Sequence, residues 1–122
     1  MFRVMIVDDQ QVFRQLCKEM LSEAGRFEVV AEADNGLEAV EKIGEVAPDL
    51  VLMDIEMPRM NGIEATREIL QRYPETQIVL VSMHKESEFM NLGHKAGALA
   101  FIAKKALTPE TLLEVLQSAD RA

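Results

Sequence analysis

Three aspartates of this chain directly follow short apolar segments, an arrangement in which carboxylates can gather around a divalent cation. Asp8 and Asp9 come after residues 4–7, and Asp54 comes after residues 50–53. Carboxylates that lie close together repel one another, and either protonation or a hard cation relieves the repulsion. Magnesium takes oxygen ligands and typically bridges one or two carboxylates to a phosphate. The spacing therefore predicts a site for Mg²⁺, with Mn²⁺ as the alternative ion.

Two polar residues that follow further apolar segments fit the chemistry of a transferred phosphoryl group. Ser82 follows residues 78–81 with a hydroxyl, and Lys104 follows residues 100–103 with an ammonium. Phosphoryl transfer is catalysed mainly by in-line positioning and by neutralising charge on the equatorial oxygens. A cation, the hydroxyl and the ammonium can share that role, and Asp54 is then the predicted nucleophile.

Each of these residues has an ordinary structural explanation when it is taken singly. An Asp after a strand is often a helix N-cap, Ser82 suits a turn, and Lys104 with Lys105 suits a solvated charge pair. Their common position favours the site, because the acids, the hydroxyl and the lysine follow separate predicted strands. Open α/β sheets bind their ligands at the carboxyl ends of the strands.

Five short apolar runs predict buried strands, since a strand that helices cover on both faces needs no polar alternation. The runs are residues 4–7, 29–31, 50–53, 78–81 and 100–103. Longer amphipathic stretches after each run predict five helices. Right-handed crossovers then give an open, doubly wound α/β sheet, in which the second run, bracketed by Glu28 and Glu32, is the expected edge.

The ends of several helices are marked by residues that commonly start or stop them. Gly25 follows the first apolar stripe as a stop. Asn35 and Asn61 each begin a sequence that resembles a capping box, and Thr108 before Pro109 gives an N-cap with proline at the first helical position. The apolar stripes comprise Val12, Phe13, Leu16, Cys17, Met20 and Leu21, then Leu37, Val40 and Ile43, then Ile63, Ile69 and Leu70, and finally Leu112, Leu113 and Leu116.

The fourth helix, at about residues 86–94, is the weakest of the five. Asn91 and Gly93 lie in its interior, and glycine alone costs a helix about 0.8–1 kcal/mol relative to alanine. We therefore expect this helix to be irregular or mobile.

The composition favours one cytoplasmic domain over residues 1–122. No apolar run approaches the roughly 20 residues of a membrane-spanning helix, and carboxylates come too early for a signal peptide. Cys17 is the single cysteine, so an internal disulfide is excluded and a small core side chain is expected. The formal net charge of −8 argues against nucleic-acid binding by this chain. His84 and His94 have no cysteine near them in sequence, which gives zinc little support.

As an ensemble, these motifs resemble the CheY-like receiver domains of two-component response regulators. The motifs are Val7, Asp8 and Asp9; Met53 to Pro58; Asn61 and Gly62; Val81 and Ser82; and Phe101 to Lys104. The resemblance covers the whole chain and implies a flavodoxin-like (βα)5 three-layer sandwich with a parallel sheet of order 2-1-3-4-5.

The resemblance also implies roles for particular residues. A sensor histidine kinase would phosphorylate Asp54, with the Glu56 backbone carbonyl joining the aspartates on the metal and Asp8 supporting. Ser82 and Phe101 would be the switch residues that respond to the phosphoryl group. The protein would then be a regulatory phosphoacceptor and not an enzyme, with self-phosphorylation or autodephosphorylation as an auxiliary property, and phosphorylation would promote a homodimer.

The segments 53–66, 82–84 and 106–110 resemble the NarL/FixJ branch, whose members usually carry a C-terminal helix-turn-helix. We expect either a receiver that regulates a transcription-factor domain missing from this chain or a stand-alone receiver. Two departures from the family pattern stand out. Lys105 occupies a common proline position, so a trans peptide bond is expected. Met83 is large for its position and predicts slow phosphate loss.

Three other function classes compete with a phosphorylated receiver. A magnesium-dependent phosphatase would usually carry a second Asp at position 56, where this chain has Glu56. A flavin or nucleotide binder would need a glycine-rich phosphate loop after the first strand, where Asp8 and Asp9 stand instead. A protein-interaction module that never accepts phosphate remains open, although the complete set of polar residues argues against it.

Overall fold

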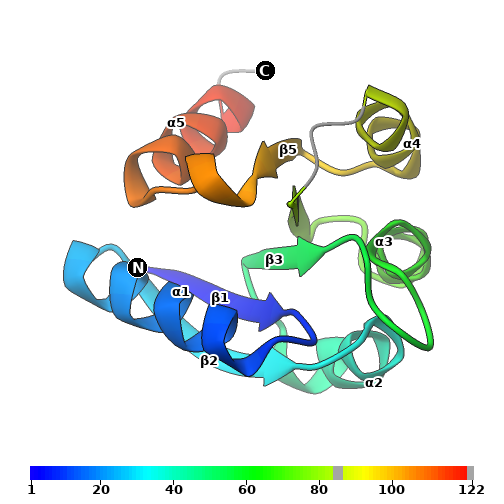
Figure 1. Cartoon of the computed structure of the whole chain (residues 1–122), viewed down its shortest axis with the longest axis horizontal. Coiled ribbons are helices and arrows are strands. Elements are labelled where there is room, and N and C mark those ends of the chain that lie inside the picture. The colour runs from blue at the N-terminus through cyan, green and yellow to red at the C-terminus, as the bar shows by residue number, and fades with distance from the viewer. Residues whose placement is uncertain (84–86, 121–122) are drawn as a thin grey trace.

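The computed structural model describes residues 1–83 and 87–120, which form five strands alternating with five α-helices (Figure 1). In chain order the elements are β1 (Phe2–Val7), α1 (Gln11–Ala24), β2 (Phe27–Ala33), α2 (Gly36–Val46), β3 (Leu50–Asp54), α3 (Gly62–Arg72), β4 (Gln77–Ser82), α4 (Ser87–Ala96), β5 (Ala100–Ala103), the 3₁₀ helix η1 (Lys104–Ala106) and α5 (Pro109–Asp120).

The five strands form one parallel sheet in the order β2-β1-β3-β4-β5, which confirms the predicted flavodoxin-like topology. Helices α1 and α5 cover one face of the sheet, and α2, α3 and α4 cover the other (Figure 1). Since the order reverses between β1 and β3, the carboxyl ends of these two strands flank the crevice in which such sheets bind ligands.

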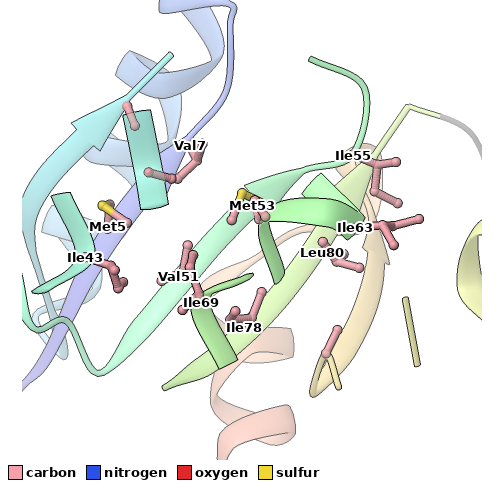
Figure 2. Packing of buried hydrophobic residues seen from close by; sticks show 14 residues of the cluster. Met5, Val7, Ile43, Val51, Met53, Ile55, Ile63, Ile69, Ile78 and Leu80 are labelled. Atoms are coloured by element: carbon pink, nitrogen blue, oxygen red, sulfur yellow. The ribbon is translucent and has the colours of Figure 1, made fainter. Parts of the chain in front are cut away.

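Alternate residues of each central strand enter two separate cores. Met5 and Val7 of β1 pack with α2 and α3 (Figure 2), whereas Val4 and Ile6 pack with α1 and α5. All five residues of β3 are buried. Full burial of one such aliphatic side chain contributes about 1.5–3 kcal/mol. The continuous apolar runs in the sequence therefore reflect strands that are covered on both faces.

The predicted helix ends are confirmed. Gly25 adopts φ of 73° after α1, in the left-handed region that favours glycine. The side chains of Asn35 and Asn61 accept hydrogen bonds from the backbone N–H groups three residues later, at 2.8 and 2.9 Å. Thr108 Oγ1 accepts a hydrogen bond from the backbone N–H of Thr111, at 3.1 Å. These caps set where α2, α3 and α5 begin.

Two predictions about the packing need correction. Strand β2 is longer than the predicted run 29–31, because its pairing with β1 continues beyond the apolar centre. Val12, Leu16 and Leu37 belong to the predicted apolar stripes, but they are 74%, 57% and 39% exposed. They lie at the margins of stripes wider than the face that meets the sheet.

Helix α4 is regular over Ser87–Ala96, so the expected irregularity is contradicted, whereas the alternative expectation of a mobile helix stays a prediction. Gly93 is buried against β4, and a Cβ atom there would lie 2.6 Å from Leu80 Cδ1. Packing against the sheet therefore outweighs the low helix propensity of glycine. His94 of this helix is exposed, whereas His84 lies outside the described residues.

None of the helices in residues 1–83 and 87–120 combines the length and the apolar character needed to cross a bilayer.

Candidate functional site

The carboxyl ends of β1, β3, β4 and β5 bring the predicted site residues to one rim of the sheet. Asp8 directly follows β1, Asp54 and Ser82 are the last residues of β3 and β4, and Lys104 directly follows β5. Ligand oxygens of Asp8, Asp9 and Asp54, here called the aspartate cluster, lie within 4.8 Å of one another. Asp8, Asp54 and Ser82 are 0%, 5% and 1% exposed, whereas Asp9 is exposed.

Lys104 brings a buried positive charge to the aspartate cluster. Its Nζ atom lies 2.7 Å from Asp8 Oδ2 and 3.8 Å from Asp54 Oδ1, and its side chain is 8% exposed. The same atom lies 4.3 Å from the centroid of the Phe13 ring. An ammonium in this position can neutralise negative charge on a group attached to Asp54.

The loop after β3 is held close to the Asp54 backbone by Gly62. The Gly62 N–H donates to the carbonyl of Ile55 at 2.9 Å, and a Cβ atom at position 62 would lie 2.2 Å from the Asp54 carbonyl oxygen. Only glycine fits this approach without moving the backbone. The start of α3 and the end of β3 are thereby fixed relative to each other.

Burial and charge change the ionisation of two groups at the site. Burial and the neighbouring Asp8 charge raise the pKa of Asp54 from 3.8 to about 7, although Lys104 opposes the shift. Burial raises the pKa of the Cys17 thiol to about 12, so Cys17 is a protonated core side chain, as the sequence predicted. The Asp54 carboxylate is therefore a costly charge that a bound cation would stabilise.

The residues present fit a hard divalent cation. Three carboxylates supply oxygen ligands, and Asp8 Oδ2 is buried without a hydrogen bond from any described residue, with the Lys104 ammonium as its near neighbour. Mg²⁺ prefers such oxygen ligands and often binds through one or two carboxylates. The cluster could hold a metal ion, whereas the role expected for the Glu56 carbonyl stays a prediction.

Arg14 of α1 holds the backbone behind the aspartate cluster and was not singled out by the sequence. Its Nη1 donates to the Asp8 carbonyl, and its Nε donates to Glu32 Oε1 on β2 at 3.0 Å. Lys18 Nζ binds the other oxygen of Glu32, also at 3.0 Å. Burial of Glu32 opposes ionisation, but hydrogen bonds from Lys18 and Arg14 outweigh it and lower the pKa of Glu32 below its ordinary value.

The switch candidates lie on neighbouring strands. Ser82 of β4 is level with Ala103 of β5, and Phe101 of β5 is level with Leu80 of β4. Phe101 is half-buried and lines a hollow of about 280 Å³ beside α4. The bond after Lys104 is trans, as are all peptide bonds among the described residues. Met83 is 72% exposed.

Comparison with known proteins places this geometry in a family. The family model described as response regulator receiver domain matches residues 4–117. The chain belongs to the response regulator receiver family. Receiver domains are regulatory phosphoacceptors, and the rim of aspartates, serine and lysine found here suits that role.

The relatives include proteins that this chain spans almost fully and proteins of which it spans about half. The chemotaxis protein CheY of Thermotoga maritima is 42% identical over 119 residues, which cover 98% of each chain. The transcriptional regulatory protein DegU of Brevibacillus brevis is 37% identical over 115 residues, covering 94% of this chain and 48% of DegU. The chain thus spans about half the length of DegU.

Among solved structures, the receiver domain of the response regulator NarL from Mycobacterium tuberculosis matches with a TM-score of 0.88 and 33% identity. The match covers 98% of this chain and 96% of that one. The resemblance to the NarL/FixJ branch is therefore confirmed, and CheY of Thermotoga maritima is matched at the higher identity of 42%.

Proposed function

We propose that residues 1–122 form a receiver domain that accepts a phosphoryl group on Asp54 from a sensor histidine kinase. The observation that carries the proposal is the position of Lys104 Nζ, 3.8 Å from Asp54 Oδ1, in a buried ion pair with Asp8. An ammonium so placed can neutralise a phosphoryl group bonded to the Asp54 carboxylate.

The chemical step is a displacement at phosphorus. An oxygen of the Asp54 carboxylate forms the new P–O bond, and the bond from phosphorus to the imidazole nitrogen of a phosphohistidine breaks. The imidazole leaves with the electron pair of that bond. Lys104 and the Ser82 hydroxyl donate hydrogen bonds to the phosphoryl oxygens, which spreads the charge that develops during transfer.

The aspartate cluster would hold the Mg²⁺ ion that receiver domains typically use, with Mn²⁺ as a substitute. Asp8, Asp9, Asp54 and the Glu56 carbonyl are the proposed ligands. When bound, the ion supplies charge neutralisation for the transferring group and favours the ionised form of Asp54.

The output of phosphorylation is a change of surface that promotes homodimerisation and regulates a transcription-factor domain outside this chain. Phosphorylation adds about −1.5 to −2 charges at Asp54. Ser82 and Phe101 are the proposed switch residues, and the hollow beside Phe101 leaves space for its ring to change position. Analytical ultracentrifugation should show a larger dimer fraction for the phosphorylated protein, and an unchanged fraction would contradict this output.

The phosphoacceptor proposal is tested with Mg²⁺, acetyl phosphate and intact-mass spectrometry. The wild-type chain should gain one phosphoryl group, and Asp54→Asn should gain none. Asp49→Asn makes the same chemical change at the other end of β3 and should be labelled as the wild type is. A chain that gains no phosphoryl group would instead be an interaction module.

The lifetime of the phosphorylated protein tests the prediction about Met83. Replacement of this side chain by alanine would open the approach of water to Asp54 and shorten the lifetime several-fold. Loss of phosphate is followed by mass spectrometry after the donor is removed. Equal lifetimes for wild type and Met83→Ala would remove Met83 from the account of phosphate loss.

A further inference from the structure

Phe13 and Lys104 come from opposite ends of the chain and meet beside the aspartate cluster. We propose that Phe13 is a positioning residue for phosphoryl transfer, whose ring face holds the Lys104 ammonium within reach of Asp54. The ring centroid lies 4.3 Å from Lys104 Nζ, well within the range of a cation–π contact. The inference rests on the proposed function and adds a residue to its machinery.

The surroundings of Lys104 explain why the contact matters. Its side chain is 8% exposed, so water can solvate the ammonium only slightly. Asp8 approaches it to 2.7 Å, much closer than Asp54 at 3.8 Å. With Asp8 as the dominant partner, the ammonium would be drawn away from the carboxylate that receives the phosphoryl group.

An aromatic face suits this position better than another polar group. The negative face of the ring attracts the cation, and this attraction is strongest when the cation is desolvated. A carboxylate or carbonyl would use up one of the three N–H donors of Lys104. The Phe13 ring carries no oxygen that competes with the phosphoryl group, so the N–H donors of Lys104 that do not face Asp8 stay available to Asp54 and its substituent.

The helix that carries Phe13 is held firmly in place. Arg14 ties the first turn of α1 to the Asp8 carbonyl and to Glu32, and Cys17, one turn further, is 2% exposed in the core. Phe13 itself packs against the same core. The ring is thus a fixed support, and its position relative to Lys104 is set by the docking of α1.

Phe13→Leu tests the proposal because it keeps an apolar side chain but removes the ring. Phe13→Tyr restores the aromatic face. Phe27→Leu is the matched control: Phe27 lies in the same core and contacts Phe2, with ring centroids 5.7 Å apart, but it is remote from the rim. Thermal unfolding of each variant shows whether the fold is retained.

Two measurements are made on the wild type and the variants. Nuclear magnetic resonance follows the ε-methylene protons of Lys104, which the ring current of Phe13 should shift upfield in the wild type and in Phe13→Tyr. The rate of phosphorylation by acetyl phosphate should fall about tenfold in Phe13→Leu. It should stay within about twofold of the wild type in Phe13→Tyr and Phe27→Leu.

The outcomes separate the inference from the proposed function. Loss of the upfield shift and of the rate in Phe13→Leu, with both retained in Phe13→Tyr, supports the positioning role. If the wild type is phosphorylated and Phe13→Leu is phosphorylated at the same rate, the positioning role is overturned while the proposed function stands. The same holds if Phe27→Leu loses as much of the phosphorylation rate as Phe13→Leu does. A wild type that is never labelled, despite an intact Lys104 signal, overturns the proposed function.

Discussion

Two aspartates bracket strand β3 and show how position on a sheet changes one residue type. Asp49 precedes the strand, is exposed, and accepts a hydrogen bond from the Arg3 N–H at 2.8 Å. Asp54 ends the strand, is 5% exposed, and has a pKa raised to about 7 by burial and by Asp8. A hollow of about 880 Å³ lies beside Asp49, yet the convergent charges lie beside Asp54.

The two aspartates differ in their environment because they have different bonding partners. Asp49 joins strands through its backbone, because its N–H donates to Arg3 and its carbonyl accepts from Gln77. These bonds are structural and leave little for a ligand to improve. Asp54 instead meets two carboxylates and one ammonium in a nearly dry setting, where an added cation changes the energy strongly. The hollow by itself is therefore a poor guide to the chemistry.

Removal of the Lys104 charge, at the carboxyl ends of the strands, should have the largest effect on stability. In Lys104→Met, Asp8 loses its buried ion-pair partner at 2.7 Å. We expect a loss of about 3–5 kcal/mol in the free energy of unfolding at neutral pH without divalent cations. Urea denaturation measures it. Lys105→Met, at the exposed neighbouring lysine, is the control and should change little, so similar losses in both variants would contradict a buried pair.

Removal of the Asp54 charge, at the carboxyl end of β3, should stabilise the protein in a pH-dependent way. Because the folded-state pKa of Asp54 lies above its ordinary value of 3.8, the folded state binds more protons than the unfolded state between that pH and about 7. Stability therefore falls as the pH rises through this window. Asp54→Asn should be more stable than wild type by about 2–4 kcal/mol at pH 8 without divalent cations.

Near pH 4 the carboxyl is protonated in the folded state, and the stabilisation by Asp54→Asn should largely disappear. Urea denaturation at both pH values in a chelator gives the comparison. Asp49→Asn, at the other end of the strand, should show no such growth with pH. A gain for Asp54→Asn that is equal at pH 4 and pH 8 would argue against a costly carboxylate.

Gly62→Ala tests whether the site needs the close approach of the Gly62 backbone to the Asp54 carbonyl at the carboxyl end of β3. The new Cβ would lie 2.2 Å from the Asp54 carbonyl oxygen, and such overpacking costs about 1–3 kcal/mol. Because the shift falls on Asp54, phosphorylation should also slow. Gly25→Ala, with φ of 73° and no contact within 4 Å, should cost about 1–2 kcal/mol without slowing phosphorylation. Equal phosphorylation rates in Gly62→Ala and Gly25→Ala would contradict a link between the Gly62 approach and phosphorylation of Asp54.

Asp49→Ala, at the amino end of β3, should have the smallest effect on stability, because this end of the strand has only a structural role. It removes one exposed hydrogen bond to the Arg3 N–H, so the expected loss is about 0.5–1.5 kcal/mol. Phosphorylation should proceed as in the wild type. A rate change like that of the carboxyl-end variants would show that the two ends are coupled.

Much of the fold was predictable because its signals are local. Apolar runs flanked by helical stripes predicted the five strands, of which β2 and β5 at the edges are only partly buried. Asn35, Asn61 and Thr108 predicted three helix starts that their hydrogen bonds confirm. The predictions that were wrong concern features that tertiary packing determines. Gly93 weakens a helix in sequence but allows α4 to approach Leu80, and Leu16 continues a stripe while remaining exposed.

By itself, the sequence determined which groups stand at the strand ends: Asp8, Asp54, Ser82 and Lys104 follow from residue order alone, because parallel strands direct their carboxyl ends to one edge. Only the tertiary structure decided that Phe13 supports Lys104. That contact joins side chains 91 positions apart, and the packing of α1 and the end of β5 against the same sheet determines whether they meet.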